Sequence, residues 1–169
     1  MVVLKGLNDD EIMDFAAKTI SDGWNVRYIE FMPIGTPNGD TSEMVTSEEI
    51  KERIQVLGKL EPYSGLKGNG PARYFRFPWA KGTVGFITAM TQHFCQSCNR
   101  LRVTADGHLR PCLLAEDEIS IKDALRSGAG TEELRKLIQK AVNLKRKEHN
   151  LKGHIVPDSG DRPMCQIGG

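Results

Sequence analysis

The sequence contains no apolar run close to the length of a membrane span, and its first residues, MVVLKGLND, lack the long apolar core of a signal peptide. We therefore expect a cytoplasmic protein with no membrane partner. The formal net charge is only +1, so the charge of the whole molecule favours neither nucleic acid nor an acidic partner. We expect no nucleic-acid partner. The sequence contains no internal repeat and no low-complexity tract, so nothing in it indicates a repeat protein.

Cysteine is scarce, with four residues in a chain of 169. Three of them, Cys95, Cys98 and Cys112, lie in the run HFCQSCNRLRVTADGHLRPCL with the spacing C-x2-C-x13-C. Without a secretory signal, such a cluster favours metal ligands over a disulfide framework. The fourth, Cys165, is predicted to be an incidental buried thiol, with a distant fourth ligand as the alternative.

The N-terminal third predicts a strand, a helix and a second strand. Residues 2–4 form a short apolar run, Asn8 is predicted to cap a helix that ends at Gly23, and residues 25–32 read as a strand that ends near Glu30 and Met32. This order is a βαβ unit, which implies a parallel sheet. Two parallel strands cannot cover both of their faces, so we expect a piece of a larger architecture.

The middle and the end of the chain add three helices and two strands. A capping box at 46–49 begins a helix that ends at Gly58, and a glycine-rich link at 64–71 precedes two β-like runs, 72–77 and 82–90. Two helices are predicted at 120–126 and 131–149. We place a domain boundary in the link, which gives domains at 1–63 and 72–169. The triplet of Lys145, Arg146 and Lys147 is explained by the negative end of the second helix's dipole.

The cysteine run predicts a β-hairpin. Asp106-Gly107 is a strong turn signal, and folding there pairs Thr104 with His108, Arg102 with Arg110 and Arg100 with Cys112. The hairpin thus brings Cys112 back beside Cys98. If the register holds, one face carries Cys98, Arg100, Arg102, Arg110 and Cys112.

The facing arginines require compensation, because like charges opposite each other destabilise a sheet. A bound anion would supply it, since the planar fork of arginine suits phosphate. A solvated basic face is the alternative.

Two kinds of metal centre suit the three cysteines. A structural zinc module would use them with His93 or His108 as the fourth ligand. An iron–sulfur cluster with only three cysteines would leave one iron free for a small molecule. The spacing alone does not decide between the two.

Four segments together carry a family resemblance: KGLNDDEI at 5–12, RYIEFMP at 27–33, the cysteine run, and RPMCQIGG at 162–169. They resemble the GTP 3′,8-cyclase family of radical S-adenosylmethionine (SAM) enzymes, which acts in molybdenum cofactor biosynthesis. The resemblance implies an α/β fold, the C-terminal part of an incomplete (β/α) barrel of the radical SAM type followed by an α+β auxiliary iron–sulfur cluster region. It also implies a lyase that converts GTP into (8S)-3′,8-cyclo-7,8-dihydroguanosine 5′-triphosphate.

The resemblance assigns roles to residues of this chain. Cys95, Cys98 and Cys112 would hold a [4Fe-4S] cluster whose open iron meets guanine, and Arg100, Leu101 and Arg102 would bind GTP. Met32 would line the SAM pocket. Apart from the resemblance, the position of Glu30 at a strand end predicts a carboxylate that either points into the barrel next to Met32 or pairs with a neighbouring arginine. The terminal Gly168 and Gly169 would thread into the active site.

One family feature is missing from these 169 residues, the C-x3-C-x2-C motif that binds the SAM-cleaving cluster. We therefore expect the C-terminal half of such an enzyme, inactive alone. Its expected partners are GTP, the N-terminal radical SAM half and a possible second copy in a homodimer.

Overall fold

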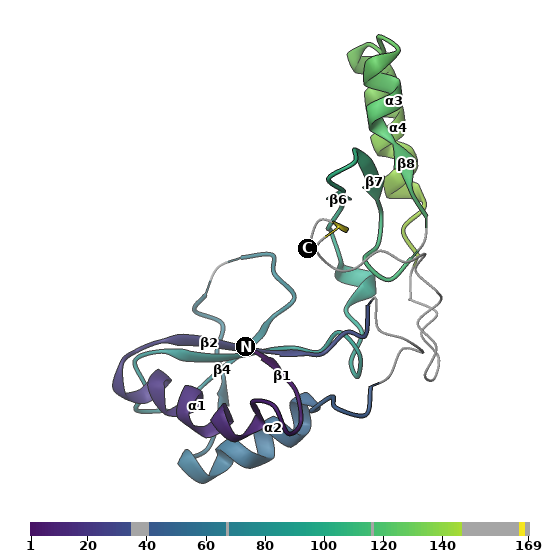
Figure 1. The fold of residues 1–169 in the computed structure, drawn as a ribbon. Coiled ribbons are helices and arrows are strands. Elements are labelled where there is room, and N and C mark those ends of the chain that lie inside the picture. The colour runs from purple at the N-terminus through teal and green to yellow at the C-terminus, as the bar shows by residue number, and fades with distance from the viewer. Residues whose placement is uncertain (35–40, 67, 116, 147–165, 168–169) are drawn as a thin grey trace. The chain divides into compact units, whose positions relative to one another are not determined.

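The structure is a computed structural model and describes residues 1–34, 41–66, 68–115, 117–146 and 166–167. Its described residues fall into two compact units (Figure 1). The first holds 1–32 and 41–94, and the second holds the rest. The sequence placed a domain boundary in the glycine-rich link at 64–71, whereas these two units divide after Phe94. The reason is that strands before and after the link pair in one sheet.

The first unit is built on a five-stranded sheet. Counted across the sheet from β1, the first three strands run parallel to one another, which confirms the predicted βαβ unit. The remaining two strands pair antiparallel. In spatial order they are β1 (Val2–Val3), β2 (Asn25–Glu30), β5 (Thr83–Ile87), β4 (Arg73–Arg76) and β3 (Glu61–Pro62).

Two helices pack on one face of this sheet (Figure 1). They are α1 (Ile12–Ser21), which a 3-10 turn η1 (Asp9–Glu11) precedes, and α2 (Ser47–Ile54), which a second turn η3 (Gln55–Leu57) follows. Tyr28 connects the layers: its hydroxyl donates to the carbonyl oxygen of Ile12 at 2.6 Å, and its ring stacks on Phe86 at 5.9 Å between centroids. The core therefore lies between the helices and the face of β2 that carries Tyr28.

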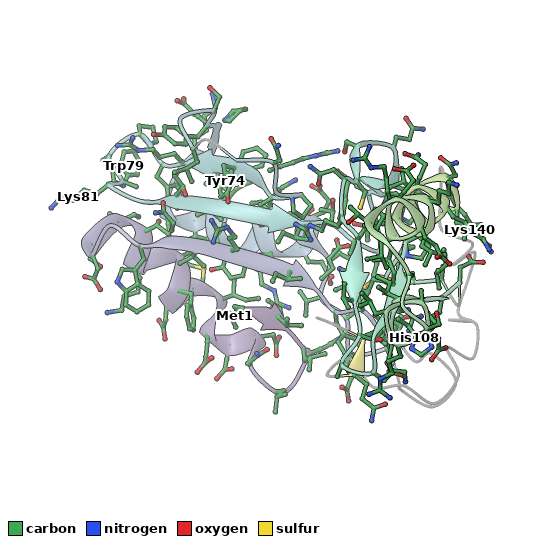
Figure 2. The ribbon with its side chains drawn as sticks, turned by 90° about the horizontal axis from the view of Figure 1, so that it is seen from above. Met1, Tyr74, Trp79, Lys81, His108 and Lys140 are labelled. Carbon is green, nitrogen blue, oxygen red and sulfur yellow. The ribbon has the colours of Figure 1, made fainter. Side chains whose placement is uncertain are left out.

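The opposite face of the sheet carries Arg27 and Tyr74, whose side chains meet across β5. Arg27 Nε donates to the Tyr74 hydroxyl at 2.7 Å (Tyr74 is labelled in Figure 2). Gly85 lies between them, and a Cβ there would be 3.0 Å from the Tyr74 ring. The glycine thus makes room for this pair.

The two predicted helix starts differ in outcome. Thr46 and Glu49 form the predicted capping box, with reciprocal hydrogen bonds of 2.8 and 3.2 Å. The prediction that Asn8 caps α1 with its side chain is wrong. Its Oδ1 accepts from Leu4 N at 2.8 Å and its Nδ2 donates to Val2 O at 2.9 Å, so it fastens the end of β1 instead.

The second unit contains a three-stranded antiparallel sheet and two helices. The elements are η4 (Cys95–Ser97), β6 (Arg102–Val103), β7 (His108–Arg110), β8 (Ile119–Ser120), α3 (Ile121–Arg126) and α4 (Thr131–Asn143). Leu109, Ile119 and Ala141 form its buried core. The helix predicted to reach residue 149 ends at Asn143, and strand β8 was not predicted.

The mixed α/β class is confirmed by these two sheets and their helices. None of the helices within the described residues is long and apolar enough to cross a membrane.

Candidate functional site

The predicted hairpin is present, with the predicted register. Arg102 pairs with Arg110, and Thr104 N donates to His108 O at 2.8 Å. The Thr104 hydroxyl accepts from His108 N at 2.9 Å, and Gly107 has φ +83°, which favours glycine. Since β6 begins only at Arg102, the predicted alternation does not extend back to Arg100 and Cys98.

Arg110 has a structural partner, which corrects the expectation that a bound anion compensates the facing arginines. The residue is only 2% exposed. Its Nη1 lies 3.2 Å from Glu118 Oε1, and its Nη2 donates to the carbonyl oxygen of Ala115. This guanidinium is therefore part of the second unit's interior.

Arg102 and Arg100 lie in a different environment, half-buried and exposed respectively. Burial lowers the pKa of Arg102, and the charge of Arg100 lowers it further. The Cys112 and Cys98 thiolates act in the opposite direction. The guanidinium of Arg102 is thus close enough to both sulfurs to feel their charge.

Cys95, Cys98 and Cys112 are all half-buried. Cys95 begins the 3-10 turn η4 and Cys98 directly follows it, with Cys98 N donating to Cys95 O at 3.1 Å. Cys112 Sγ accepts from Leu114 N at 3.4 Å, and Cys98 Sγ lies 3.7 Å from Lys145 Nζ. Lys145 was explained from the sequence by the helix dipole alone, so this contact is a site feature that the sequence reasoning missed.

Zinc and an iron–sulfur cluster place different demands on the three thiols. Among the described residues, no three His, Cys, Asp or Glu side chains converge to hold a metal ion. Zinc needs its ligands within about 2.3 Å of one point, whereas the cysteines of a cluster bind different irons. His108, one proposed zinc ligand, has its Nδ1 3.2 Å from Asp106 Oδ2.

The remaining predicted site residues lie in varied places. Leu101 is partly buried and packs against the core of the second unit. Met32 is half-buried just after β2. Cys165, Gly168 and Gly169 lie outside the described residues.

Among the described residues, the Glu30 carboxylate bonds to backbone amides and to the Thr91 hydroxyl. Glu30 is fully buried, and its Oε1 accepts from Ser47 N at 3.1 Å. Its Oε2 accepts from Met90 N and Thr91 N at 3.0 and 2.9 Å. Glu30 therefore ties the end of β2 to the start of α2 and to the segment after β5.

A family model described as Molybdenum Cofactor Synthesis C matches residues 24–151, which is more than half of the chain. The chain belongs to this family.

Curated relatives extend the similarity to the whole chain. The GTP 3′,8-cyclases of Moorella thermoacetica and Thermodesulfovibrio yellowstonii are 49% and 48% identical over 170 residues, each alignment covering 100% of this chain and 51% of the relative. That of Heliobacterium modesticaldum is 46% identical over 176 residues, with 100% and 52% covered. The chain spans about half the length of these relatives, and its predicted resemblance to GTP 3′,8-cyclases is confirmed.

Proposed function

We propose that this chain is the part of a GTP 3′,8-cyclase that binds an auxiliary [4Fe-4S] cluster and holds GTP beside it, in molybdenum cofactor biosynthesis. The main support is the hairpin, where the half-buried Arg102 lies close to Arg100 and to the thiols of Cys98 and Cys112. Guanidinium groups bind phosphate and cysteine thiolates bind iron. Placed side by side, they suit a nucleotide that contacts an iron–sulfur cluster.

Cys95, Cys98 and Cys112 would hold the cluster, which when bound supplies an open iron as a Lewis acid for the guanine ring. Arg102 and Arg100 would bind the triphosphate, each able to donate two parallel hydrogen bonds. Burial of Arg102 strengthens such bonds, because its charge is less well solvated. The task of these residues is to position GTP, and positioning alone can supply a large part of a rate enhancement.

Further parts of the proposal concern residues outside the hairpin. Met32 would line the SAM pocket, and Gly168 and Gly169 would approach the substrate. In this proposal the barrel, the radical chemistry and any homodimer belong to the whole enzyme. The 169 residues contain no C-x3-C-x2-C motif, so we expect them alone not to cleave SAM.

The test begins with anaerobic reconstitution of the 169-residue chain with iron and sulfide, followed by metal analysis and GTP titration. Arg102→Ala should weaken GTP binding by about ten- to hundredfold, because a hydrogen bond to a charged group contributes about 1.5–3 kcal/mol. Arg126→Ala is the matched control, since it removes the same charge from an exposed position of α3.

Three outcomes would contradict the proposal. One is stoichiometric zinc, without iron and sulfide, in protein purified without oxygen. Another is equal GTP affinity of the Arg102→Ala and Arg126→Ala variants. Formation of 5′-deoxyadenosine from SAM by this chain would refute its expected inactivity alone.

A further inference from the structure

Lys145 lies two residues beyond the end of α4 and contacts the cysteine hairpin from outside. Its Nζ donates to the carbonyl oxygens of Arg100 at 2.8 Å and Pro111 at 3.0 Å, and it lies 3.7 Å from Cys98 Sγ. An ammonium group has three N–H donors, so these acceptors account for all of them. The position of Lys145 in the sequence does not explain why its ammonium group has an acceptor for each of its three N–H donors.

The acceptors belong to both arms of the hairpin. Cys98 and Arg100 lie on the arm before β6, and Pro111 lies on the arm after β7, next to Cys112. Both of these stretches lie outside the β6–β7 ladder, which pairs only two residues of each strand. One ammonium group therefore joins the two arms at the end where the cysteines are.

The segment that carries Lys145 is itself fixed. Lys145 N donates to Val142 O at 3.1 Å, which continues the end of α4, and the neighbouring Arg146 pairs with Asp117 at 3.2 Å. Ala141 on α4 is buried in the same core as Leu109 of β7. The ammonium thus reaches the hairpin from a supported position.

We propose that Lys145 is a positioning residue that joins the arms bearing Cys98 and Cys112 before any cluster binds, so that these ligands are already held near each other. This purpose rests on the proposed function, in which the cysteines bind a cluster. A preformed arrangement reduces the conformational entropy lost when the ligands bind. Arginine would be a poor substitute, because its planar fork cannot direct three donors from one nitrogen.

The experiment uses the 169-residue chain with three substitutions. Lys145→Met removes the ammonium group, and Lys145→Arg keeps the charge but changes the geometry. The control is Lys140→Met, which removes a positive charge from an exposed position of α4 (Figure 2). Lys145→Gln, which keeps two donors, replaces Lys145→Met if that variant unfolds.

The first measurement is amide hydrogen exchange in the metal-free chain. In Lys145→Met we expect exchange in β6 and β7 to be about tenfold faster or more, while β2 and β5 in the first unit stay unchanged. Lys145→Arg should resemble Lys145→Met, and Lys140→Met should resemble the original chain. Full rescue by Lys145→Arg would mean that only the positive charge matters, and it would overturn the proposal, as would unchanged exchange in Lys145→Met.

The second measurement is iron and sulfide content after reconstitution, with the electron paramagnetic resonance spectrum of the reduced protein. We expect Lys145→Met to retain less cluster and to give a broader spectrum than Lys140→Met. Equal content and spectra would overturn the positioning role even if exchange were faster. Failure of the original chain to bind a cluster would refute the proposed function, while the exchange result would still decide whether Lys145 joins the arms.

Discussion

Glu30 provides a direct test of how the first unit is held together. The substitution Glu30→Gln keeps the shape of the side chain and changes one acceptor oxygen into an NH2 donor. In the structure, each carboxylate oxygen accepts from more than one group: Ser47 N and the Thr91 hydroxyl bond to Oε1, and Met90 N and Thr91 N bond to Oε2. Three of these four donors are backbone amides that cannot reverse their role.

The magnitude follows from the best orientation of the new amide. If its oxygen takes the two amides of Met90 and Thr91, its NH2 group faces Ser47 N, and two donors oppose each other. A buried donor left without an acceptor costs about 1–3 kcal/mol, and the remaining bonds lose their charge assistance. We expect Glu30→Gln to lower the free energy of unfolding by about 3 kcal/mol. Glu30→Ala should cost at least as much, because it adds a cavity and leaves every donor unpaired.

Denaturant unfolding, followed by circular dichroism, measures this loss. The control is Glu48→Gln, since Glu48 is an exposed carboxylate on α2 whose pairing with Lys51 at 2.8 Å is worth about 0.5 kcal/mol or less. A Glu30→Gln protein within about 0.5 kcal/mol of the Glu48→Gln protein would refute the reasoning, because the buried amides would then have found water or other acceptors.

Two further predictions concern local structure. Thr46→Ala removes the side-chain half of the capping box and should destabilise the protein by about 1 kcal/mol in denaturant unfolding. Hydrogen bonds from Thr46 hold the pKa of Glu49 below its ordinary value, so this carboxylate stabilises the fold above that value and loses the effect as pH falls through its folded pKa. The acid limb of a stability–pH profile should therefore be shallower in Thr46→Ala, and an identical limb would contradict this. Gly107→Ala should cost about 1–3 kcal/mol, because φ is +83° and the new Cβ would lie 2.7 Å from Lys122 Cβ; unchanged thermal unfolding would contradict it.

Features with local causes could be predicted from the sequence. The capping box of Thr46 and Glu49 spans four residues, and the Asp106-Gly107 turn fixes the register of Arg102 and Arg110. Both follow from the hydrogen-bonding capacity of neighbouring residues. The failure at Asn8 shows the limit of this approach, because a side chain suited to capping found better acceptors and donors in the adjacent strand.

Features with distant causes could not be predicted in this way. Glu30 finds its partners 17 to 61 residues away, and Lys145 finds its own 34 to 47 residues away. Strand β8 has only two residues, too few for a period-2 pattern. These contacts depend on tertiary packing, which sequence patterns within one segment do not describe.

The facing pair of Arg102 and Arg110 shows how tertiary packing changes a functional interpretation. In the sequence the two arginines are equivalent, and together they predict an anion that compensates both. Strand β8 removes this equivalence, since the segment leading into it brings Glu118 to Arg110. The repulsion in the hairpin is therefore already reduced without a ligand, and a phosphate would gain only the contacts of Arg102 and Arg100. It follows that GTP binding should be sensitive to Arg102, whereas loss of Arg110 should act first through folding, because it leaves Glu118 without its buried partner.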